Sequence, residues 1–240
     1  MSNARHIQLA GRRVVWRLRA SRRAQRLQVS VSYAEGVEVV VPSGHEHHLD
    51  AEAFLREQAD WVLGRLEEVD RLREQAAPRQ YGDGGYFPLF GQSCPLDVKG
   101  NRDRPSARYR QGRVELQLAD PLDVEVIKSA LEALLRFIAR EVCESRCRYW
   151  ARELGVTVGK VRIAGQKTRW GSCSNSGTIS FNWRLVLAEP KVLDYVIAHE
   201  LTHLIHFDHG AGFQATLDRV CPGWRVQEEW LAAKGELLRL

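Results

Sequence analysis

The stretch HELTHLIHFDH, residues 199–209, concentrates side chains that bind metal ions and holds four of the chain's eight histidines. His199 and His203 are four residues apart, so on a helix their imidazoles share one face and can reach the same tetrahedral cation. Imidazole suits zinc, and a zinc ion with three protein ligands keeps an open position for a water of lowered pKa. Glu200 lies beside that position and can act as a general base. The pattern predicts a zinc-dependent hydrolase.

The third protein ligand depends on where this helix ends. His206 would lie about 10 Å along the helix axis from His199, so the two imidazoles do not easily bind one ion. His209 can reach the ion only if the helix ends after His203. Asp208 and Gly210 favour such an end because both residue types accept left-handed backbone, and Asp208 is also expected to orient a ligand. We rank the candidates for third ligand in this order: His209, then Glu228 or Glu229, then His206.

Two other interpretations of the histidines were weighed. A pair of core histidines satisfied by hydrogen bonds is the structural alternative for His199 and His203, and a third histidine close behind argues against it. Metzincins have the same spacing from the second to the third histidine, but they also need a Met-turn. The only methionine is Met1, so that clan is excluded.

Residues upstream of the histidines are candidates for the walls of a catalytic cleft. Arg169 is the candidate catalytic cation, because a guanidinium can stabilise a developing oxyanion. Together with Lys167 and Arg184 it could instead clamp phosphates. The strand TISFNWRLV, residues 178–186, is expected at a sheet edge, where an extended peptide would pair with it.

Three further residues near the cleft are expected to serve structure rather than catalysis. Trp170 and Trp183 have the size of packing or wall residues, and Cys173 fits a role in turn packing. Cys143 and Cys147 are four residues apart, a spacing that can bind metal, but no further ligand lies near them in sequence. We therefore interpret both as buried packing residues.

The elements that must position these groups are mostly strands in the first half and helices in the second. Alternating apolar and polar residues predict strands, and apolar residues three or four apart predict helices. We expect strands near residues 14–19, 26–33, 37–42, 86–91, 95–100, 113–119, 156–165 and 178–188, with a turn at Glu35-Gly36 and a polar loop over 166–177. We expect one helix over 49–74, a second from Asp120-Pro121 to Gly155, and others from Pro190, after Gly210 and after Pro222-Gly223. No internal repeat is evident.

Length, cysteines and charge limit the class of protein. A chain of 240 residues can bury a sizeable core without disulfides, as one large domain or two small lobes. Five scattered cysteines indicate a reducing, cytoplasmic setting, and no apolar run is long enough to span a membrane. Residues 1–34 carry eight arginines and no acid. We expect a folded basic strand pair there, and a phosphate-binding surface or a targeting segment are less favoured.

Several motifs together resemble one known family. The loop RWGSC, the strand NWRL and the helix HELTHLIHFDHGAGF match the YgjP-like metallopeptidases, which are related to SprT-like and minigluzincin metallopeptidases of the zincin type. The early segments RRAQRLQVSV and VEVVVP also match, so the likeness covers nearly the whole chain. The fourth histidine, His206, departs from the pattern.

The resemblance implies an α+β fold with a zincin-like catalytic half, residues 120–240, behind a β-rich N-terminal portion, residues 1–119, that has one long helix. It implies that His199, His203 and His209 bind Zn²⁺ and that Glu200 activates water.

Two activities follow from such a site. The first is a metallopeptidase acting on a peptide or protein. The alternative, which the resemblance implies because some relatives are credited with hydrolysing UTP, is a metal-dependent pyrophosphatase of nucleoside triphosphates. Basic residues of the N-terminal strands, the loop 101–110 and the segment KTRW would then bind the phosphates. A nucleic-acid-associated protein with a structural metal is the least favoured reading, because Glu200 stands beside two ligands.

Overall fold

The computed structural model describes residues 4–32, 36–44, 50–75, 80–100, 105–166, 169–174 and 176–238. Contacts within the chain define two compact units, residues 1–77 and 78–238, and each unit is considered by itself. Both combine helices with open sheets, which confirms the α+β class. The portion boundary expected at residues 119 and 120 falls inside unit 2, and the catalytic role of residues 120–240 stays a prediction.

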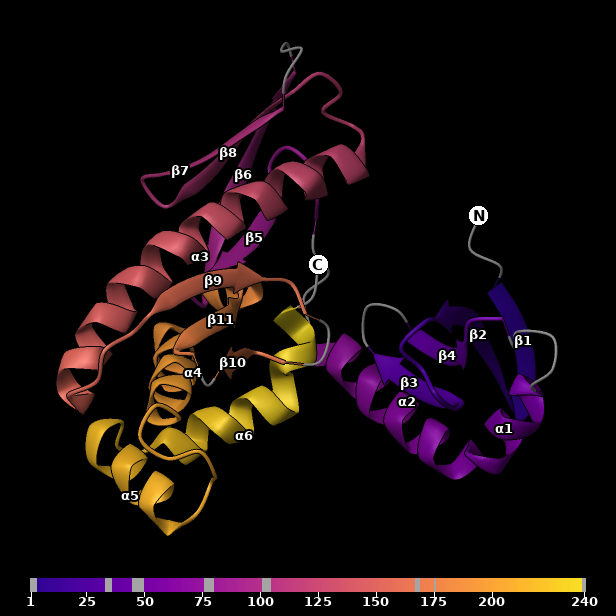
Figure 1. The fold of residues 1–240 in the computed structure, drawn as a ribbon. Helices are drawn as coiled ribbons and strands as arrows, with labels where there is room; N and C mark the ends of the chain where they lie inside the picture. Colours follow the sequence, from indigo (N-terminus) through magenta and orange to yellow (C-terminus); the bar gives the residue numbers. More distant parts are fainter. Residues whose placement is uncertain are drawn as a thin grey trace. The chain divides into compact units, whose positions relative to one another are not determined.

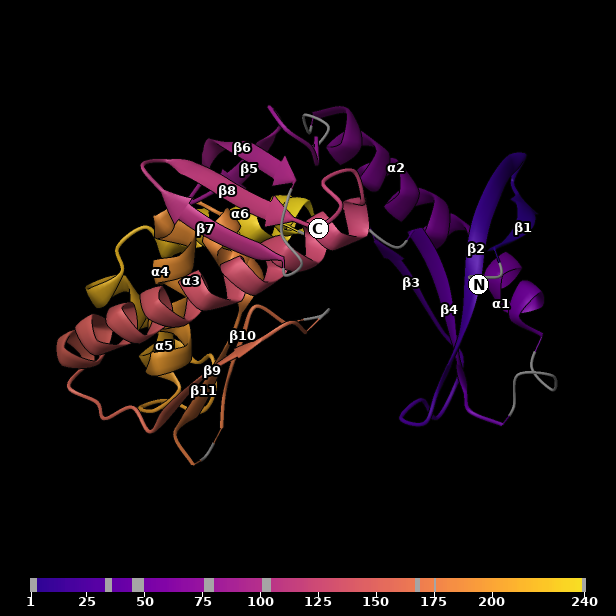
Figure 2. The same cartoon turned by 90° about the horizontal axis from the view of Figure 1, so that it is seen from above.

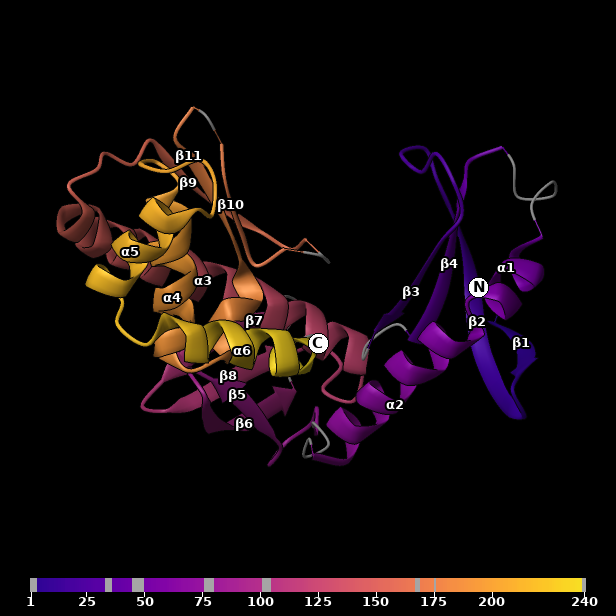
Figure 3. The same ribbon diagram turned by 90° about the horizontal axis from the view of Figure 1, so that it is seen from below.

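Unit 1 is a four-stranded sheet with helices on one face (Figure 3). Its elements are β1 (Ala4–Leu9), β2 (Arg12–Ser21), β3 (Gln28–Ser32), β4 (Gly36–Pro42), α1 (Ala51–Glu57) and α2 (Ala59–Gln75). The core joins Trp16 and Val39 of the sheet to Leu55 and Val62 of the helices. The single helix expected here is interrupted at Gln58, which caps α1 with φ −96° and ψ 14°. Glu35 of the expected turn lies outside the described residues.

Unit 2 is built around one long helix. Its elements are β5 (Tyr86–Leu89), β6 (Gln92–Gly100), β7 (Ser106–Arg110), β8 (Arg113–Leu118), α3 (Val124–Leu154), β9 (Lys160–Ala164), β10 (Gly171–Cys173), β11 (Thr178–Asn182), the 3₁₀ turn η1 (Trp183–Leu187), α4 (Pro190–Thr202), α5 (Ala211–Val220), α6 (Trp224–Lys234) and η2 (Gly235–Leu238). Helix α3 runs between the sheet β5–β8 and the sheet β9–β11 (Figures 1 and 2). It begins at the side-chain cap of Asp123 and ends at Gly155, whose φ of 68° suits glycine. Cys143 and Cys147 are buried on it, as predicted.

The two four-stranded sheets repeat one arrangement. Their orders, β1-β2-β4-β3 and β5-β6-β8-β7, correspond strand for strand, and in both the central pair is parallel and the outer pairs are antiparallel. Each first hairpin turns on two residues of positive φ, Ala10-Gly11 and Phe90-Gly91. Five residues beyond each turn glycine, the register is the same, with Trp16 opposite Val37 and Leu96 opposite Val114. The sequence shows no internal repeat because the copies share topology and, on the central strand pair, the alternation of buried residues, but not residue identity.

The strand expected over residues 178–188 is shorter than predicted and central in its sheet. β11 ends at Asn182, whose side chain accepts a hydrogen bond from the Arg184 N–H and so starts η1. The sheet order is β10-β11-β9, so the edge strand within the expected loop is β10. A side chain that competes for backbone donors can end a strand in this way, and sequence alternation alone does not reveal it.

Two contacts fix helix α4 inside unit 2. Arg146 of α3 donates two hydrogen bonds to the Asp194 carboxylate of α4, at 2.6 and 2.5 Å, and the Trp150 indole N–H donates a third at 3.2 Å. At the start of α4, the Phe90 N–H donates to the Val186 carbonyl at 2.7 Å. A Cβ on Gly91 would lie 2.6 Å from the Glu189 Cγ, so the β5–β6 turn packs closely on the residue before α4.

No helix of the described residues is long and apolar enough to cross a membrane.

We expect Asp194→Ala to lower the free energy of unfolding of unit 2 by about 1–3 kcal/mol, because it removes a part-buried acceptor of three hydrogen bonds. Urea denaturation followed by tryptophan fluorescence measures the change. Glu125→Ala, which removes an exposed pair with Lys128 at 3.0 Å, is the matched control and should cost about 0–0.5 kcal/mol. Equal losses in the two variants would contradict a clamping role for Asp194.

Candidate metal centre

Helix α4 ends where the candidate ligands need it to end. Its last residue is Thr202, and His203 caps it with φ −64° and ψ −15°. The Thr202 hydroxyl donates to the Ala198 carbonyl at 2.7 Å, and the N–H groups of Ile205 and His206 both donate to the Thr202 carbonyl at 2.9 Å. These bonds close the helix in a tight turn. The predicted end of the helix at its second histidine is therefore confirmed.

The turn brings three imidazoles together. One ring nitrogen from each of His199, His203 and His209 lies within 4.8 Å of the others. The Nε2 atoms of His199 and His209 are 3.2 Å apart. Two nitrogens bound to one tetrahedral zinc would lie about 3.4 Å apart, given bonds of about 2.1 Å. Among the described residues this is the one cluster of its kind, and its donors fit a divalent metal such as zinc.

Hydrogen bonds at the far side of two rings direct their Nε2 atoms toward this point. Nδ1 of His203 is 3.1 Å from the His206 carbonyl, which can only accept. Nδ1 of His199 is 3.4 Å from the Tyr195 hydroxyl, which in turn donates to Glu228 at 3.2 Å. Because Nδ1 carries the proton in such an arrangement, Nε2 keeps its lone pair. Burial, helped by the neighbouring histidines, also lowers the pKa of His199 to about 4, which favours the neutral ring.

Phe213 forms the apolar floor beneath the three rings. It lies on α5, is 2 % exposed, and has its ring centroid 4.9, 4.8 and 4.7 Å from those of His199, His203 and His209. The prediction from sequence missed this residue. Its apolar position on the helix after Gly210 was the available signal, and that signal does not distinguish a floor residue from ordinary core.

His206 and Glu228, two other candidates for third ligand, have different partners. The His206 ring is 3.1 Å from the Thr216 hydroxyl, and a Cβ on Gly212 would lie 2.9 Å from it, so the ring is held against α5. Glu228 accepts its hydrogen bond from Tyr195. Asp208 accepts from the Gly210 N–H at 2.9 Å and shapes the turn into α5. These contacts support His209 as the third ligand.

Glu200 is buried beside the cluster, with 7 % of its surface exposed. Its carboxylate accepts a hydrogen bond from the Cys173 backbone N–H. A Cβ on Gly171 would lie 2.5 Å from the Glu200 Oε1, so β10 can approach the carboxylate only with glycine at this position. Burial raises the pKa of Glu200 to about 7, while the charge of Arg169 and the Cys173 N–H oppose the rise. A carboxyl with its pKa near neutrality is suited to exchange protons.

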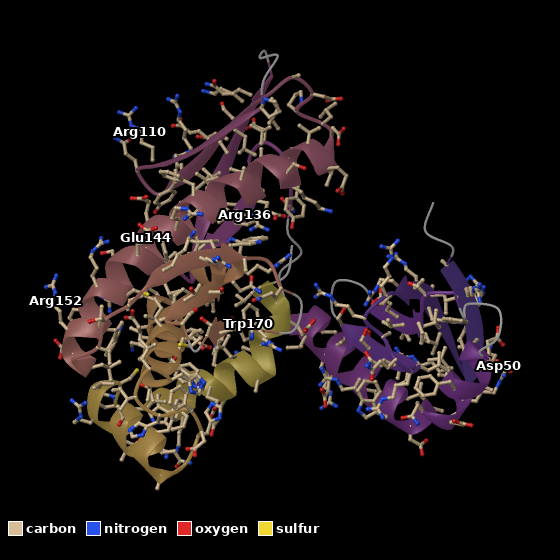
Figure 4. The ribbon with its side chains drawn as sticks, in the orientation of Figure 1. Asp50, Arg110, Arg136, Glu144, Arg152 and Trp170 are labelled. Carbon is tan, nitrogen blue, oxygen red and sulfur yellow. The ribbon has the colours of Figure 1, made fainter. Side chains whose placement is uncertain are left out.

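Two cavities meet at Glu200 and His199, and Arg169 and Gly171 line both. The cavity on the α6 side, about 340 Å³, is otherwise lined by Trp170, Tyr195, Val196, Glu228, Leu231 and Ala232. The cavity on the His209 side, about 390 Å³, is otherwise lined by Ser172, Cys173, Ser174, His203, Phe207 and His209. Trp170 is thus a wall residue, and its ring packs against Gly235 of η2, near the end of α6 (Figure 4).

Asn182 explains why the loop RWGSC and the strand NWRL occur together. Its side-chain amide donates to the carbonyls of Gln166 and Arg169 at 2.7 and 3.2 Å, and its backbone N–H donates to the Trp170 carbonyl at 2.8 Å. This buried residue therefore holds the segment that carries Arg169 at the rim of the cavities. Trp183 is fully buried.

Arg184, another cation that was a candidate for the cleft, is not part of it. The Arg184 guanidinium lies 4.3 Å from the centroid of the Trp183 ring and lines neither cavity. Lys167 lies outside the described residues.

We expect His209→Ala to weaken zinc binding at least about 100-fold, because it removes one of three converging donors. His206→Ala should keep zinc affinity within about tenfold and lower the unfolding temperature instead. Competition with a chromophoric chelator measures affinity for both variants. The reverse order of the two affinities would show that His206 is the third ligand.

Comparison with known proteins identifies the family of the chain. The sequence matches the YgjP-like metallopeptidase domain over residues 25–234. The chain is similar to the metallopeptidase zymogen abylysin of Pyrococcus abyssi, at 28% identity over 40% of this chain and 96% of that chain, with a TM-score of 0.36. It is also similar to the zymogen jannalysin of Methanocaldococcus jannaschii, at 20% identity over 38% of this chain and 96% of that chain, with a TM-score of 0.33. Comparison with curated proteins gave no match. The family match covers most of the chain, which therefore belongs to the YgjP-like metallopeptidase family and is a metal-dependent hydrolase.

Proposed function

We propose that the protein is a zinc-dependent peptidase in which His199, His203 and His209 hold the metal and Glu200 is the general base. The observation that carries the proposal is the position of Glu200, buried against β10 and adjacent to three converging imidazoles. A structural zinc site is closed by four protein ligands and has no need of such a carboxylate. The five cysteines are free, which supports a reducing compartment such as the cytoplasm.

The chain's own residues account for the proton transfers of peptide hydrolysis. When bound, zinc would polarise the scissile carbonyl and lower the pKa of the attacking water. Glu200 takes a proton from this water as its oxygen attacks the carbonyl carbon, and then delivers that proton to the leaving amine. Arg169, exposed at the rim of both cavities, supplies positive charge toward the negative charge that develops on the carbonyl oxygen.

The edge strand β10 is the proposed site of substrate pairing. It bonds to β11 on one side only, and its residues line the cavities on the other side. An extended peptide that adds to this edge is held by backbone bonds and crosses the position of Glu200. β10 takes the role first expected for residues 178–186.

The nucleotide alternative has less support from the described residues. Of the described basic groups of unit 2 that were expected to bind phosphates, Arg169 alone lines the two cavities. Arg110, from the basic loop, lies on the sheet β5–β8, on the other side of α3 from Trp170 (Figure 4). Residues 101–104 and Lys167 lie outside the described part of the chain. The charge of one cation is small against that of a triphosphate, and this favours a peptide substrate.

We expect Glu200→Gln to keep one zinc per chain and to lose peptide hydrolysis at least about 100-fold, because the amide cannot accept the proton of water. A mixed peptide library and nucleoside triphosphates are offered side by side to both proteins, and new termini or pyrophosphate are measured. Retained turnover in Glu200→Gln would remove the assigned base. Pyrophosphate release by the unsubstituted protein, lost with Arg169→Ala, would replace the peptidase by the nucleotide enzyme.

Gly171→Ala tests the contact between β10 and the base. We expect kcat to fall at least about tenfold with zinc retained, because the added methyl group would lie 2.5 Å from the Glu200 carboxylate and must displace it. Gly64→Ala, where a Cβ meets nothing within 4 Å, is the control and should leave kcat unchanged. Zinc content and kcat are measured on each variant. An unchanged kcat in Gly171→Ala would contradict a role for the position of this carboxylate.

A further inference from the structure

The sheet of unit 1 presents a concentrated positive charge that the proposed peptidase does not use. Residues 4–32 hold eight arginines and no acidic residue, and unit 1 contains no lysine. Helices α1 and α2 with their cap, residues 50–75, hold eight acidic residues and four arginines. Because the helices cover one face of the sheet, the unit is basic on its sheet side and acidic on its helix side.

Strand alternation places arginines on the face that the helices leave open. Val14, Trp16 and Leu18 of β2 face the core, so Arg13, Arg17 and Arg19 point to the opposite face, and all three are exposed. Successive arginines at positions 17 and 19 are about 6.6 Å apart along the strand. Arg22, Arg23 and Arg26, in the loop after β2, are also exposed. These six arginines are called the basic surface below.

Four of the six arginines of the basic surface have no ion-pair partner among the described residues. Arg19 pairs with Glu38 of β4 at 2.8 Å. Among the described residues, Arg13, Arg22, Arg23 and Arg26 form no ion pair. Four exposed guanidinium groups, those of Arg13, Arg22, Arg23 and Arg26, are therefore available to an anionic partner.

Protection of a sheet edge does not explain these arginines. β2 lies inside the sheet, between β1 and β4, so it has no free edge to protect. In the repeated sheet of unit 2, the positions equivalent to Arg13, Arg17 and Arg19, counted from the turn glycine, are Ser93, Asp97 and Lys99. The same arrangement of strands forms there with a serine and an acid on β6. Arginine at these positions of β2 is thus not a requirement of the fold.

We propose that the basic surface binds the phosphodiester backbone of a nucleic-acid duplex. Arginine presents a planar fork that matches phosphate oxygens, and several such contacts release counterions from the duplex. Among the described residues of the open face there is no Phe, Tyr or Trp on which unpaired bases could stack, which favours a duplex over a single strand. Contacts to the backbone alone carry no sequence information, so duplexes of either sugar are bound.

The test uses the full-length, zinc-loaded protein and labelled 20-base-pair duplexes of DNA and RNA. Fluorescence anisotropy is measured between 50 and 200 mM KCl, with labelled poly-glutamate as the competing class of partner. We expect both duplexes to bind and log K to fall against log salt with a slope of about −4, because four neutralised phosphates contribute about −0.9 each. Poly-glutamate should bind more weakly.

A matched pair of triple variants locates the binding. Arg13→Ser/Arg22→Ser/Arg23→Ser should reduce the magnitude of the slope by about 3 and weaken duplex binding at least about 30-fold at 50 mM KCl. The control, Arg56→Ser/Arg65→Ser/Arg71→Ser, removes the same charge from the helices and should change affinity less than about threefold. Replacing Arg13, Arg22 and Arg23 by lysine retains the charge and should keep most of the binding.

Four results would overturn the proposal. They are equal losses in the two serine triples, unchanged binding in the first serine triple, loss of binding in the lysine triple with its fold intact by circular dichroism, and tighter binding of poly-glutamate than of either duplex. The last result would identify an acidic polypeptide as the partner. Peptidase activity with a short peptide is measured in parallel and is expected to be unchanged in every triple, so a failure of the proposed function is distinguishable from a failure of this one.

Discussion

The whole candidate site depends on the termination of α4 at Thr202. An α-helix that continued would carry His209 about 15 Å along its axis from His199, out of reach of a shared ion. The carbonyl of Thr202 accepts two N–H groups in the turn that follows, and this bonding ends the regular pattern. The chain can then reverse direction, enter α5 at Gly210 and bring the third imidazole back. Phe213, on the same helix, fills the space beneath the three rings.

The rest of unit 2 holds this short motif in place. Arg146 of α3 donates hydrogen bonds to Asp194 of α4, and the β5–β6 turn packs on the residue before α4. On the opposite side of the site, Asn182 fixes the segment that leads into β10. The Glu200 side chain therefore lies between α4 and β10, and only glycine fits at position 171, where β10 contacts the carboxylate. Burial of a carboxyl in this position raises its pKa.

The repeated sheet shows one scaffold used in two ways. In unit 2 the sheet β5–β8 packs on α3, and its hairpin turn reaches η1 and the start of α4, so it serves the site. In unit 1 the corresponding sheet carries arginines on its open face, where the second copy has Ser93 and Asp97. On the central strand pair the alternation of buried residues is kept while the exposed residues differ. A core constrains its residues through packing, whereas a solvent face is free to acquire a different partner.

Local patterns in the sequence determined much of this protein. The spacing of His199 and His203, with Glu200 between them, predicts one shared face because the helical period is fixed. Gly155 marks the predicted end of α3, whereas the helix starts at Asp123 rather than at the expected Asp120-Pro121. Gly210 begins α5 with φ −66°, so it does not adopt the left-handed backbone that was expected of it. Contacts between residues far apart in sequence were decided by the tertiary structure alone. They are the packing of Gly171 on Glu200, the hydrogen bond from Tyr195 to Glu228 and the contact of His206 with α5. The position of β10, rather than β11, at the sheet edge was decided in the same way. These contacts depend on how separate elements pack, and periodicity carries no information about distance between elements. The repeat of the two sheets is not visible in the sequence for the same reason, because it is a repeat of strand pairing.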